Sequence, residues 1–205
     1  MIKITIEQLN KAVEVIDDDE KYGGDEIALQ KFFQQFPLNT PDDIPAVAAK
    51  IGLIDTFYST NLRMQRMSAT HLARIISDPE LHFDERIEAG DTSVVDDLLQ
   101  KPSSNLFSFF SKYATLHNYL IYDRDDFAIY DRSVSKDIYK YTNNPRIKSV
   151  NSAEDQYRKK RDYSGWVQLI TGILEANQID DPHAKRKLDW FIWSENKSDY
   201  FGTKR

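Results

Sequence analysis

Residues Leu106–Val134 read LFSFFSKYATLHNYLIYDRDDFAIYDRSV, and this stretch decides both the fold and the candidate site of the chain. Its first half has the apolar and aromatic content of a buried helix, and it carries one lysine, Lys112, within a run of Phe and Tyr. A polar turn follows, and Asp131 then stands at the start of a second helix. Asp131 lies nineteen positions after Lys112. A helix followed by a turn and the start of a second helix can bring two side chains at this separation face to face.

The chemistry of Lys112 and Asp131 makes them the leading candidate for a catalytic pair. A lysine in apolar surroundings exists readily as an uncharged, nucleophilic amine, because burial disfavours the charged form. A carboxylate in the first turn of a helix is stabilised by the positive end of the helix dipole. An amine and a carboxylate together can attack and stabilise an electron-poor carbon. The alternative interpretation is a solvated lysine and an ordinary N-cap aspartate.

Length and composition limit the class of protein. At 205 residues, with 40% apolar and 12% aromatic residues, the chain can form one large folded domain or two closely packed lobes. It contains no cysteine, which excludes disulfides, thiolate metal sites, iron–sulfur clusters and cysteine nucleophiles. The N-terminus has no secretory pattern, and no 18-residue apolar run occurs. We therefore expect a soluble, cytoplasmic protein.

The charge distribution is uneven. The net charge of −6 argues mildly against a nucleic-acid partner, but residues 131–205 hold 15 Lys and Arg against 11 Asp and Glu, whereas residues 1–130 hold 12 against 22. This division fits a basic face on an acidic body, or attraction between two lobes. The densest basic run is Arg158-Lys159-Lys160-Arg161. Such a run is usually a solvated helix end, but beside neighbouring aromatic residues it could also bind phosphates.

The pattern of apolar residues predicts an all-α fold, a compact bundle of about nine or ten short helices in a single helical domain. Two lobes with a cleft between them, 1–52 plus 152–205 and 53–151, are a further division of this domain. The expected helices include those at 5–18, 26–36, 53–62, 131–141 and 166–176.

Three local patterns give further expectations. Gly23-Gly24 should break the chain before the helix at 26–36. Met64 and Met67 begin a stripe of apolar residues at helical spacing, which predicts core positions. The chain has four histidines and no HxxxH or HExxH spacing, so we expect no metal site and no cofactor.

The stretch around the lysine resembles the helix-hairpin-helix DNA glycosylases, most closely the oxoguanine-type enzymes. In that family a helix after a hairpin bears a nucleophilic lysine, and an aspartate starts another helix nineteen residues later. Ser111-Lys112 and Tyr130-Asp131 fall at the matching places. The chain departs from the family at Ser108 and Phe110, where the phosphate-binding hairpin has glycines, and at Ala128, where a proline is usual.

Other segments extend the resemblance over roughly residues 55–195. The segment FYSTNL at 57–62 is similar to the helix end that faces the opened duplex in that family, which would make Ser59 and Asn61 wedge or gap-filling residues. The chain is also similar to uncharacterised bacterial proteins with a YSTN…FASKY…PIYDS pattern and a late LDxxxW helix. Those motifs correspond here to 58–61, 109–118, 129–133 and 188–193.

The resemblance implies a base-excision enzyme that acts on duplex DNA carrying a modified base. The base would be flipped out of the stack into a pocket. Asp131 would deprotonate or orient Lys112, which would attack the sugar and form a Schiff base. Candidates to line the base pocket are His117, Trp190 and Trp193, and the Arg158–Arg161 run would neutralise phosphates.

Two other classes of function remain open from the sequence. One is a non-catalytic helical module that binds nucleic acid or a partner protein, in a bacterial defence or regulatory setting. Net negative charge and the missing hairpin glycines favour it. The other is a lysine-dependent enzyme that acts on a small carbonyl compound. A fold alone does not decide between these classes.

Overall fold

The all-α prediction is confirmed. A computed structural model of the chain describes residues 1–19 and 22–196, and this part contains no β-strand. Within it, no helix has both the length and the apolarity needed to cross a membrane. The α-helices are α1 (Ile6–Asp17), α2 (Tyr22–Gln35), α3 (Ile44–Phe57), α4 (Ala69–Ile76), α5 (Phe83–Glu88), α6 (Ser93–Leu98), α7 (Phe107–Tyr122), α8 (Arg132–Asp137), α9 (Tyr163–Ala176) and α10 (Ala184–Glu195).

Four short turns of helix complete the secondary structure. Three are 3-10 turns, and the fourth is a π-helical turn that contains the start of the basic run. They are η1 (Pro41–Asp43), η2 (Pro79–Leu81), η3 (Ile138–Tyr141) and η4 (Glu154–Arg158).

The central helix is α7, because twelve of its sixteen residues are buried. A helix with this pattern must be surrounded by other elements, and α7 packs against α2, α3, α5 and α6. It ends at Asp123, which adopts a left-handed conformation with φ of 52°. An aspartate tolerates this conformation better than most residues, so α7 can stop without a glycine. The expected position of the buried aromatic helix is thus confirmed.

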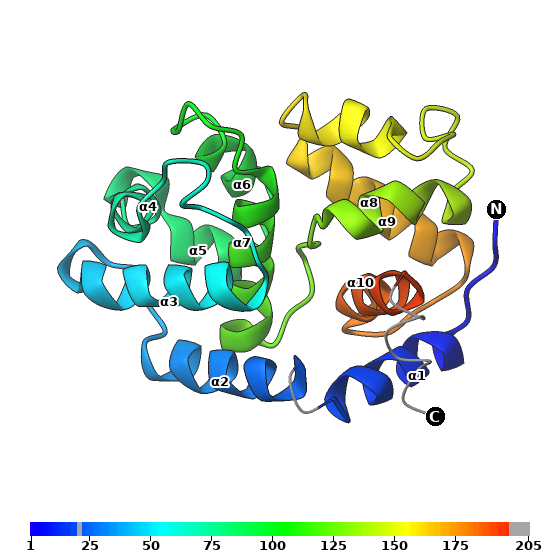
Figure 1. Cartoon of the computed structure of the whole chain (residues 1–205), viewed down its shortest axis with the longest axis horizontal. Helices are drawn as coiled ribbons and strands as arrows, with labels where there is room; N and C mark the ends of the chain where they lie inside the picture. Colours follow the sequence, from blue (N-terminus) through cyan, green and yellow to red (C-terminus); the bar gives the residue numbers. More distant parts are fainter. Residues whose placement is uncertain (20–21, 197–205) are drawn as a thin grey trace.

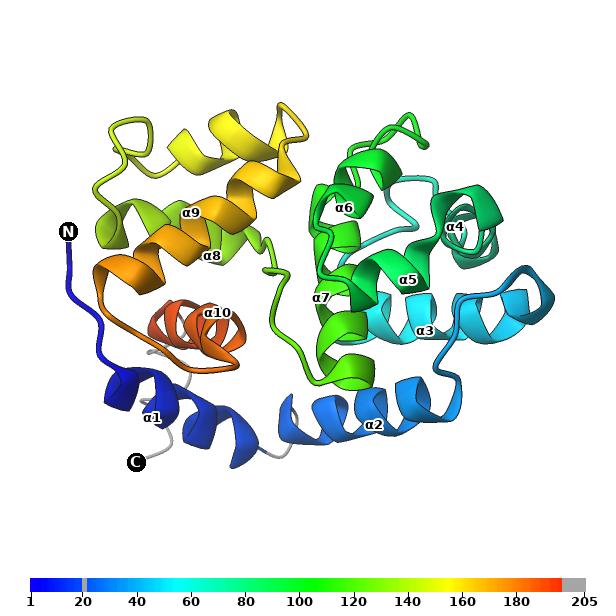
Figure 2. The same ribbon diagram turned by 180° about the vertical axis from the view of Figure 1, so that it is seen from behind.

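The helices form two groups, which we call the first and second lobes. Figures 1 and 2 show α2–α7 on one side and α1, α8, α9 and α10 on the other. In the second lobe α1 packs against α10, and α6 meets α9 where the lobes touch. This grouping differs from the predicted one, because α2 and most of α3 lie with α7, and α8 lies with α10. The predicted lobe 152–205 also extends past residue 196, outside the described residues.

Two helix boundaries were predicted wrongly. The predicted helix at 53–62 is the last part of α3, which ends at Phe57, and residues 58–68 form a loop. Met64 lies in this loop and is 83% exposed, so its predicted core position was wrong. Gly23 does not break the chain but lies within α2. A Cβ atom on Gly23 would come 2.7 Å from the carbonyl oxygen of Asp17, so the close approach of α1 and α2 requires glycine there.

The segment that joins α7 to α8 runs between the lobes, and side chains of the second lobe hold it in place. The hydroxyl of Tyr163 donates to the carbonyl of Ala128 and accepts from its N–H, both at 3.0 Å. The indole of Trp166 donates to the carbonyl of Ile129 at 3.2 Å. The carboxylate of Asp125 accepts two backbone N–H groups from the start of α10. The path of this segment fixes where α8 begins.

Candidate active site

A cavity of about 340 Å³ lies between the lobes and contains the predicted Lys112–Asp131 pair. Its wall is formed by α1, α2, the end of α3, α7, the start of α8 and α10. The lining residues are Ile16, Tyr22, Asp25, Glu26, Phe57, Tyr58, Ser59, Lys112, Ile129, Asp131, Arg132, Ser133, Arg186, Asp189, Trp190 and Trp193. The cavity therefore combines aromatic walls with seven ionisable Asp, Glu, Lys and Arg side chains.

Lys112 and Asp131 form a direct ion pair. The Nζ of Lys112 lies 3.1 Å from Oδ2 of Asp131 and donates a second hydrogen bond to the Ser108 hydroxyl at 3.0 Å. Lys112 is only 2% exposed, and its ammonium lies 5.9 Å from the centre of the Tyr58 ring. The amine is thus buried in aromatic surroundings but reaches the cavity. The Ser108 hydroxyl, one helical turn earlier on α7, serves as its second acceptor.

The pair is aligned by a hydrogen bond between the preceding residues. Ser111 Oγ accepts the backbone N–H of Tyr130 at 3.0 Å, and both residues are buried. Lys112 directly follows Ser111, and Asp131 directly follows Tyr130. The hydrogen bond therefore holds the backbone at Asp131 beside the backbone at Lys112, so that the two side chains can meet. Asp131 is also the N-cap of α8, and its Oδ1 accepts the N–H of Ser133 at 2.7 Å.

Asp131 is held in its ionised form. Burial alone would raise the pKa of this carboxyl group, but the positive charge of Lys112 and the hydrogen bonds from Ser133 and Lys112 outweigh it. The pKa of Asp131 therefore lies below its ordinary value. A carboxylate that stays charged beside an amine can stabilise positive charge that develops next to it.

A second charged cluster occupies the wall of the cavity beside Tyr58. Arg186 is buried and donates to Glu26, to the Tyr58 hydroxyl at 2.6 Å and to Asp189 at 3.1 Å. Tyr58 in turn donates to Glu26. The guanidinium group stacks over Trp190, with its Cζ 4.4 Å from the ring centre. This cluster ties α2 and the end of α3 to α10.

Asp189 is the least satisfied member of this cluster. Its Oδ1 is buried and has no hydrogen-bond partner within the described part of the chain. Burial raises the pKa of Asp189 to about 7, and the negative charge of Asp131 adds to the shift, while Arg186 opposes it. Two of the carboxyl groups that line the cavity are therefore shifted in opposite directions: the pKa of Asp131 is lowered and that of Asp189 is raised.

The structure brings together five of the residues that the sequence proposed for a site. Lys112, Asp131, Ser59, Trp190 and Trp193 all line the cavity. Trp193 also makes an edge-to-face contact with Tyr22, with ring centres 4.8 Å apart. Asn61 does not line the cavity. It is exposed in the loop after α3, where its side chain donates to the carbonyl of Ser59 at 2.7 Å.

His117 does not line the cavity, so its predicted place beside Lys112 is corrected. It lies five positions after Lys112, which turns its side chain by about 140° around the helix axis. It is buried away from the cavity, with Nε2 3.0 Å from Oδ1 of Asp84. Burial lowers its pKa despite this partner. Asn39 and Tyr113 belong to the same buried cluster, so the histidine is a packing residue of the first lobe.

The basic run at 158–161 has local partners. Arg158 pairs with Glu154 and Lys159 with Asp155, each four residues earlier, and Lys160 donates to Gln156 in the same way. Arg161 instead donates to the backbone carbonyls of Leu99 and Ser103, in the turn between α6 and α7. These contacts fit a helix end and a brace between the lobes, and phosphate binding by this run stays a prediction.

Several residues of the cavity were not predicted from the sequence. Arg186, Glu26 and Asp189 form its second charged cluster, and Arg132 lies at its edge. The sequence contains one feature that could have indicated this cluster. Arg186 and Asp189 are three positions apart on the last helix, so the two opposite charges lie on the same face of that helix. No group of three or more His, Asp or Glu side chains in residues 1–19 and 22–196 is arranged to hold a metal ion.

Comparison with known proteins identifies the family. A family model described as HI_0787_N, N-terminal domain, matches residues 8–126, which is more than half of the chain. The chain therefore belongs to this family. No curated protein and no solved structure matches it significantly. The matched part contains Lys112 and ends five residues before Asp131.

Proposed function

We propose that this member of the HI_0787_N family is a base-excision enzyme of DNA repair, a DNA N-glycosylase with lyase chemistry. Lys112 would be its nucleophile and Asp131 its carboxylate partner. The observation that carries the proposal is the position of the buried Lys112 amine, 3.1 Å from Asp131 and at the wall of an aromatic cavity. The oxoguanine-glycosylase resemblance of the 106–134 stretch supports the choice of substrate.

The cavity suits a flipped base in size and in lining. Its volume of about 340 Å³ falls in the range of pockets that enclose small ligands. Trp190 and Trp193 offer aromatic faces on which a base could stack, and both lie on α10, across the cavity from Lys112 on α7. Asp189 and Arg186 supply polar groups between these walls. Enzymes that act on a flipped base use stacking faces and polar edges of this kind.

The proposed reaction begins with proton transfer from the Lys112 ammonium to Asp131 when the substrate displaces water from the pair. The Nζ then forms a bond to the anomeric carbon of the sugar, and the bond from that carbon to the base breaks. The bonding electron pair leaves with the base, which takes up a proton from the attacking nitrogen. Because Asp131 is ionised in the free protein, it can accept the proton of the Lys112 ammonium as the general base and hold it during the attack.

Ring opening would follow at the same two residues. Asp131 returns its proton to the ring oxygen of the sugar, the bond from that oxygen to the anomeric carbon breaks, and a protonated imine forms with Lys112. Asp131, again a carboxylate, then takes a proton from the neighbouring sugar carbon, and the resulting elimination expels the 3′ phosphate and cleaves the strand. Water then hydrolyses the imine, which releases the sugar product and regenerates the Lys112 amine.

Borohydride trapping tests the proposal. The protein is incubated with duplexes that carry oxidised bases or an abasic site, reduced, and run on a denaturing gel. We expect a covalent band for the wild type, none for Lys112→Gln, and an unchanged band for Lys50→Met, which removes another buried lysine outside the cavity. Absence of a band on every lesion, with the proteins folded, would remove lysine chemistry from consideration.

A non-catalytic binding module is the second candidate function. It is favoured by the extent of the family match, which includes Lys112 but ends before Asp131. In that case the cavity would serve binding alone. Duplex affinity that is equal in the wild type and Lys112→Gln, without any trapped band, would support this candidate.

A further inference from the structure

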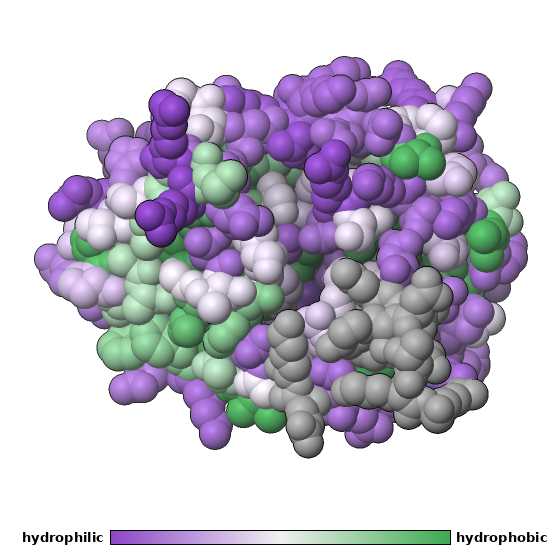
Figure 3. All heavy atoms as spheres, viewed as in Figure 1, coloured by the Kyte–Doolittle hydropathy of each residue, from purple (hydrophilic) through white to green (hydrophobic). Residues whose placement is uncertain are grey.

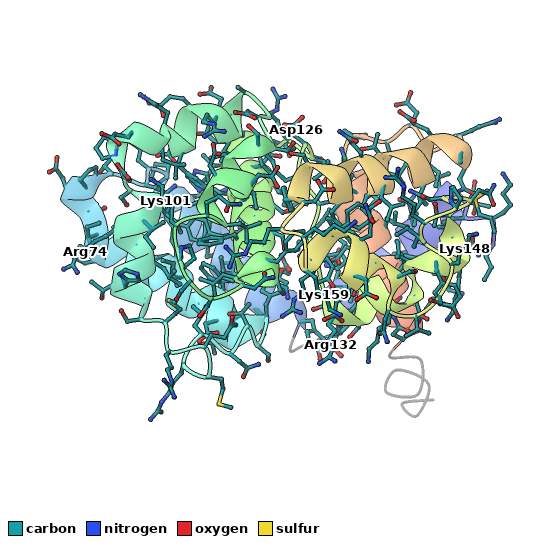
Figure 4. All side chains as sticks on the ribbon, turned by 90° about the horizontal axis from the view of Figure 1, so that it is seen from above. Arg74, Lys101, Asp126, Arg132, Lys148 and Lys159 are labelled. Atoms are coloured by element: carbon teal, nitrogen blue, oxygen red, sulfur yellow. The ribbon has the colours of Figure 1, made fainter. Side chains whose placement is uncertain are left out.

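A second cavity, of about 240 Å³, lies on the second lobe and shares no lining residue with the cavity that holds Lys112. It is bounded by the N-terminal segment, by the end of η3 with the loop after it, and by the later half of α9. Figures 1 and 2 show these segments together at the outer edge of the second lobe, away from α7. In Figure 4, Lys148 of the loop lies at this outer edge, whereas Arg132 of the first cavity lies near the boundary between the lobes. The two cavities are therefore separate sites.

One wall of the second cavity is a stripe of α9. Leu169, Gly172, Ile173 and Ala176 line it, and their spacing places them on one face of the helix. The stripe is apolar and has a gap at Gly172. A Cβ atom there would meet nothing within 4 Å, and the residue has no positive φ, so neither packing nor backbone geometry requires glycine. Alanine would favour the helix more, but its methyl group would take up part of the cavity.

Three uncharged polar groups border this stripe. They are the Gln168 amide on α9, the Asn143 amide in the loop after η3, and the Tyr141 hydroxyl at the end of η3. None of these three side-chain groups has a hydrogen-bond partner within the described residues, although Tyr141 as a whole is only 6% exposed. Ligand sites typically combine an apolar wall with a few polar groups that fix the orientation of the ligand.

The N-terminal segment forms a fixed border of the cavity. The Ile2 N–H donates to the carbonyl of Lys140 at 2.7 Å, and the Ile4 N–H donates to the side chain of Asn177 at 3.0 Å. The segment is therefore tied both to η3 and to the end of α9. Figure 3 shows apolar atoms at this edge of a mostly hydrophilic lobe, where Met1 is 43% exposed and lines the cavity. A cavity with fixed borders loses little conformational entropy when a ligand enters.

The lining restricts the chemistry of the ligand. Among the described residues, no Asp, Glu, His, Lys or Arg side chain lines the cavity, so a charged ligand would lose its hydration without gaining an ion pair. A hydrocarbon would leave the free amides and the hydroxyl without partners. A sugar carries hydroxyl groups on all sides, and some of them would be buried against the apolar stripe. A planar ring with apolar faces and a polar edge fits both parts of the lining.

We propose that this cavity binds one uncharged nucleobase, with its ring against the α9 stripe at Gly172 and its edge paired with Gln168 and Asn143. Side-chain amides suit that edge, because each presents a donor and an acceptor side by side, as the edge of a base does. The volume of about 240 Å³ suits a single ring system better than a larger ligand. The base can belong to a free nucleoside or to a single strand. This site goes beyond the proposed function and does not depend on it, since no residue of the Lys112 cavity takes part.

Titration with adenosine tests the site. In ¹⁵N-labelled protein, adenosine should shift the side-chain amide resonances of Gln168 and Asn143, whereas binding in the first cavity would shift the indole resonances of Trp190 and Trp193. By calorimetry, Gln168→Ala should weaken binding about tenfold or more, because it removes a two-bond contact with the base. Gln34→Ala is a matched control, since it replaces an exposed glutamine of α2, and should bind adenosine as the wild type does. Glucose should not bind.

Gly172→Ala is the sharpest variant, because its expected effects on stability and on binding have opposite signs. The melting temperature should rise by about 1–4 °C, since alanine is the better helix former. The affinity for adenosine should fall about tenfold or more, since the added methyl group occupies the place of the ring. Gly52→Ala is the control. Gly52 lies within α3, outside both cavities, and a Cβ atom there also meets nothing within 4 Å, so the melting temperature should rise without a change in affinity.

The outcomes also separate this inference from the proposed function. Unchanged adenosine affinity in Gly172→Ala, amide resonances that do not shift at saturation, or glucose binding equal to that of adenosine would each overturn the site. An oligodeoxyadenylate strand whose binding Gly172→Ala weakens as much as that of adenosine would identify a single strand as a source of the base, and binding of adenosine alone would identify the free nucleoside. Lys112→Gln should bind adenosine as the wild type does, so failure of borohydride trapping would leave this site standing.

Discussion

Replacement of Ser111 by alanine is the sharpest test of how the site is built. The Ser111 hydroxyl is buried and accepts the N–H of Tyr130, which is also buried. Alanine removes the acceptor and leaves a buried backbone donor without a partner. That loss costs about 1–3 kcal/mol. For a domain of this size, each kcal/mol lowers the melting temperature by about 2–4 °C, so a decrease of roughly 2–12 °C is expected.

The same change should impair the proposed chemistry more than it impairs folding. Without the Ser111–Tyr130 bond, the next residue, Asp131, is no longer held level with Lys112. A displacement of about 1 Å in a reacting group can lower a rate about a hundredfold. We therefore expect slower formation of the trapped adduct at temperatures where the variant is fully folded, measured by single-turnover trapping and by circular dichroism on the same sample.

Ser77→Ala provides the matched control. Ser77 is also buried, but its hydroxyl has no hydrogen-bond partner within the described residues, so its removal should be neutral or slightly stabilising. A melting temperature for Ser111→Ala equal to that of Ser77→Ala would refute the assigned role of the hydrogen bond. A lower melting temperature with an unchanged trapping rate would show that the bond stabilises the fold without positioning the pair.

Three further predictions concern buried ionisable groups. Burial lowers the pKa of Lys50 to about 8 in the folded protein, whereas the ordinary value for lysine is about 10.5. Between these two pH values the unfolded chain binds one proton more than the folded protein, so the free energy of unfolding should rise with pH by up to about 1.4 kcal/mol per pH unit. In urea titrations at these pH values, Lys50→Met should not show this rise. The carboxyl carbon of Asp189 should titrate by NMR near pH 7 and that of Asp131 below its ordinary range, and the reverse order would contradict the assigned environments. Between about pH 4 and 7, Asp189 stays protonated in the folded protein but loses its proton in the unfolded chain. The free energy of unfolding should therefore decrease as the pH rises through this range, and Asp189→Asn should remove that decrease.

The features predicted correctly from sequence are those set by short stretches of the chain. The aromatic stretch after Leu106 is too apolar for a surface helix, and the nineteen-residue interval fixes how far Asp131 can lie from Lys112. The pairing of these two residues, 3.1 Å apart, agrees with that expectation. Local pattern was sufficient because both residues lie on neighbouring elements joined by one short segment.

The features missed from sequence depend on helix rotation or on distant contacts. The spacing of five positions turns His117 by about 140° from Lys112, but a helix that is buried on nearly every side has no exposed face to show which direction the cavity occupies. The exposure of Met64 depends on left-handed residues around it, whereas its spacing alone matched a buried stripe. One partner of Arg186 is Glu26, which lies 160 residues away in the sequence, and no pattern in a single sequence predicts a contact over that separation.

Both ionic clusters of the cavity cross the boundary between the lobes, and this links the site to the fold. Lys112 belongs to the first lobe and Asp131 to the second, while Arg186 of the second lobe contacts Glu26 and Tyr58 of the first. Buried ion pairs contribute little net stability, because desolvation offsets their attraction. We infer that they favour one arrangement of the lobes, because any other would leave these buried charges unpaired. A substrate that enters the cavity must compete for these same groups, so its binding should loosen the contacts that hold the lobes together.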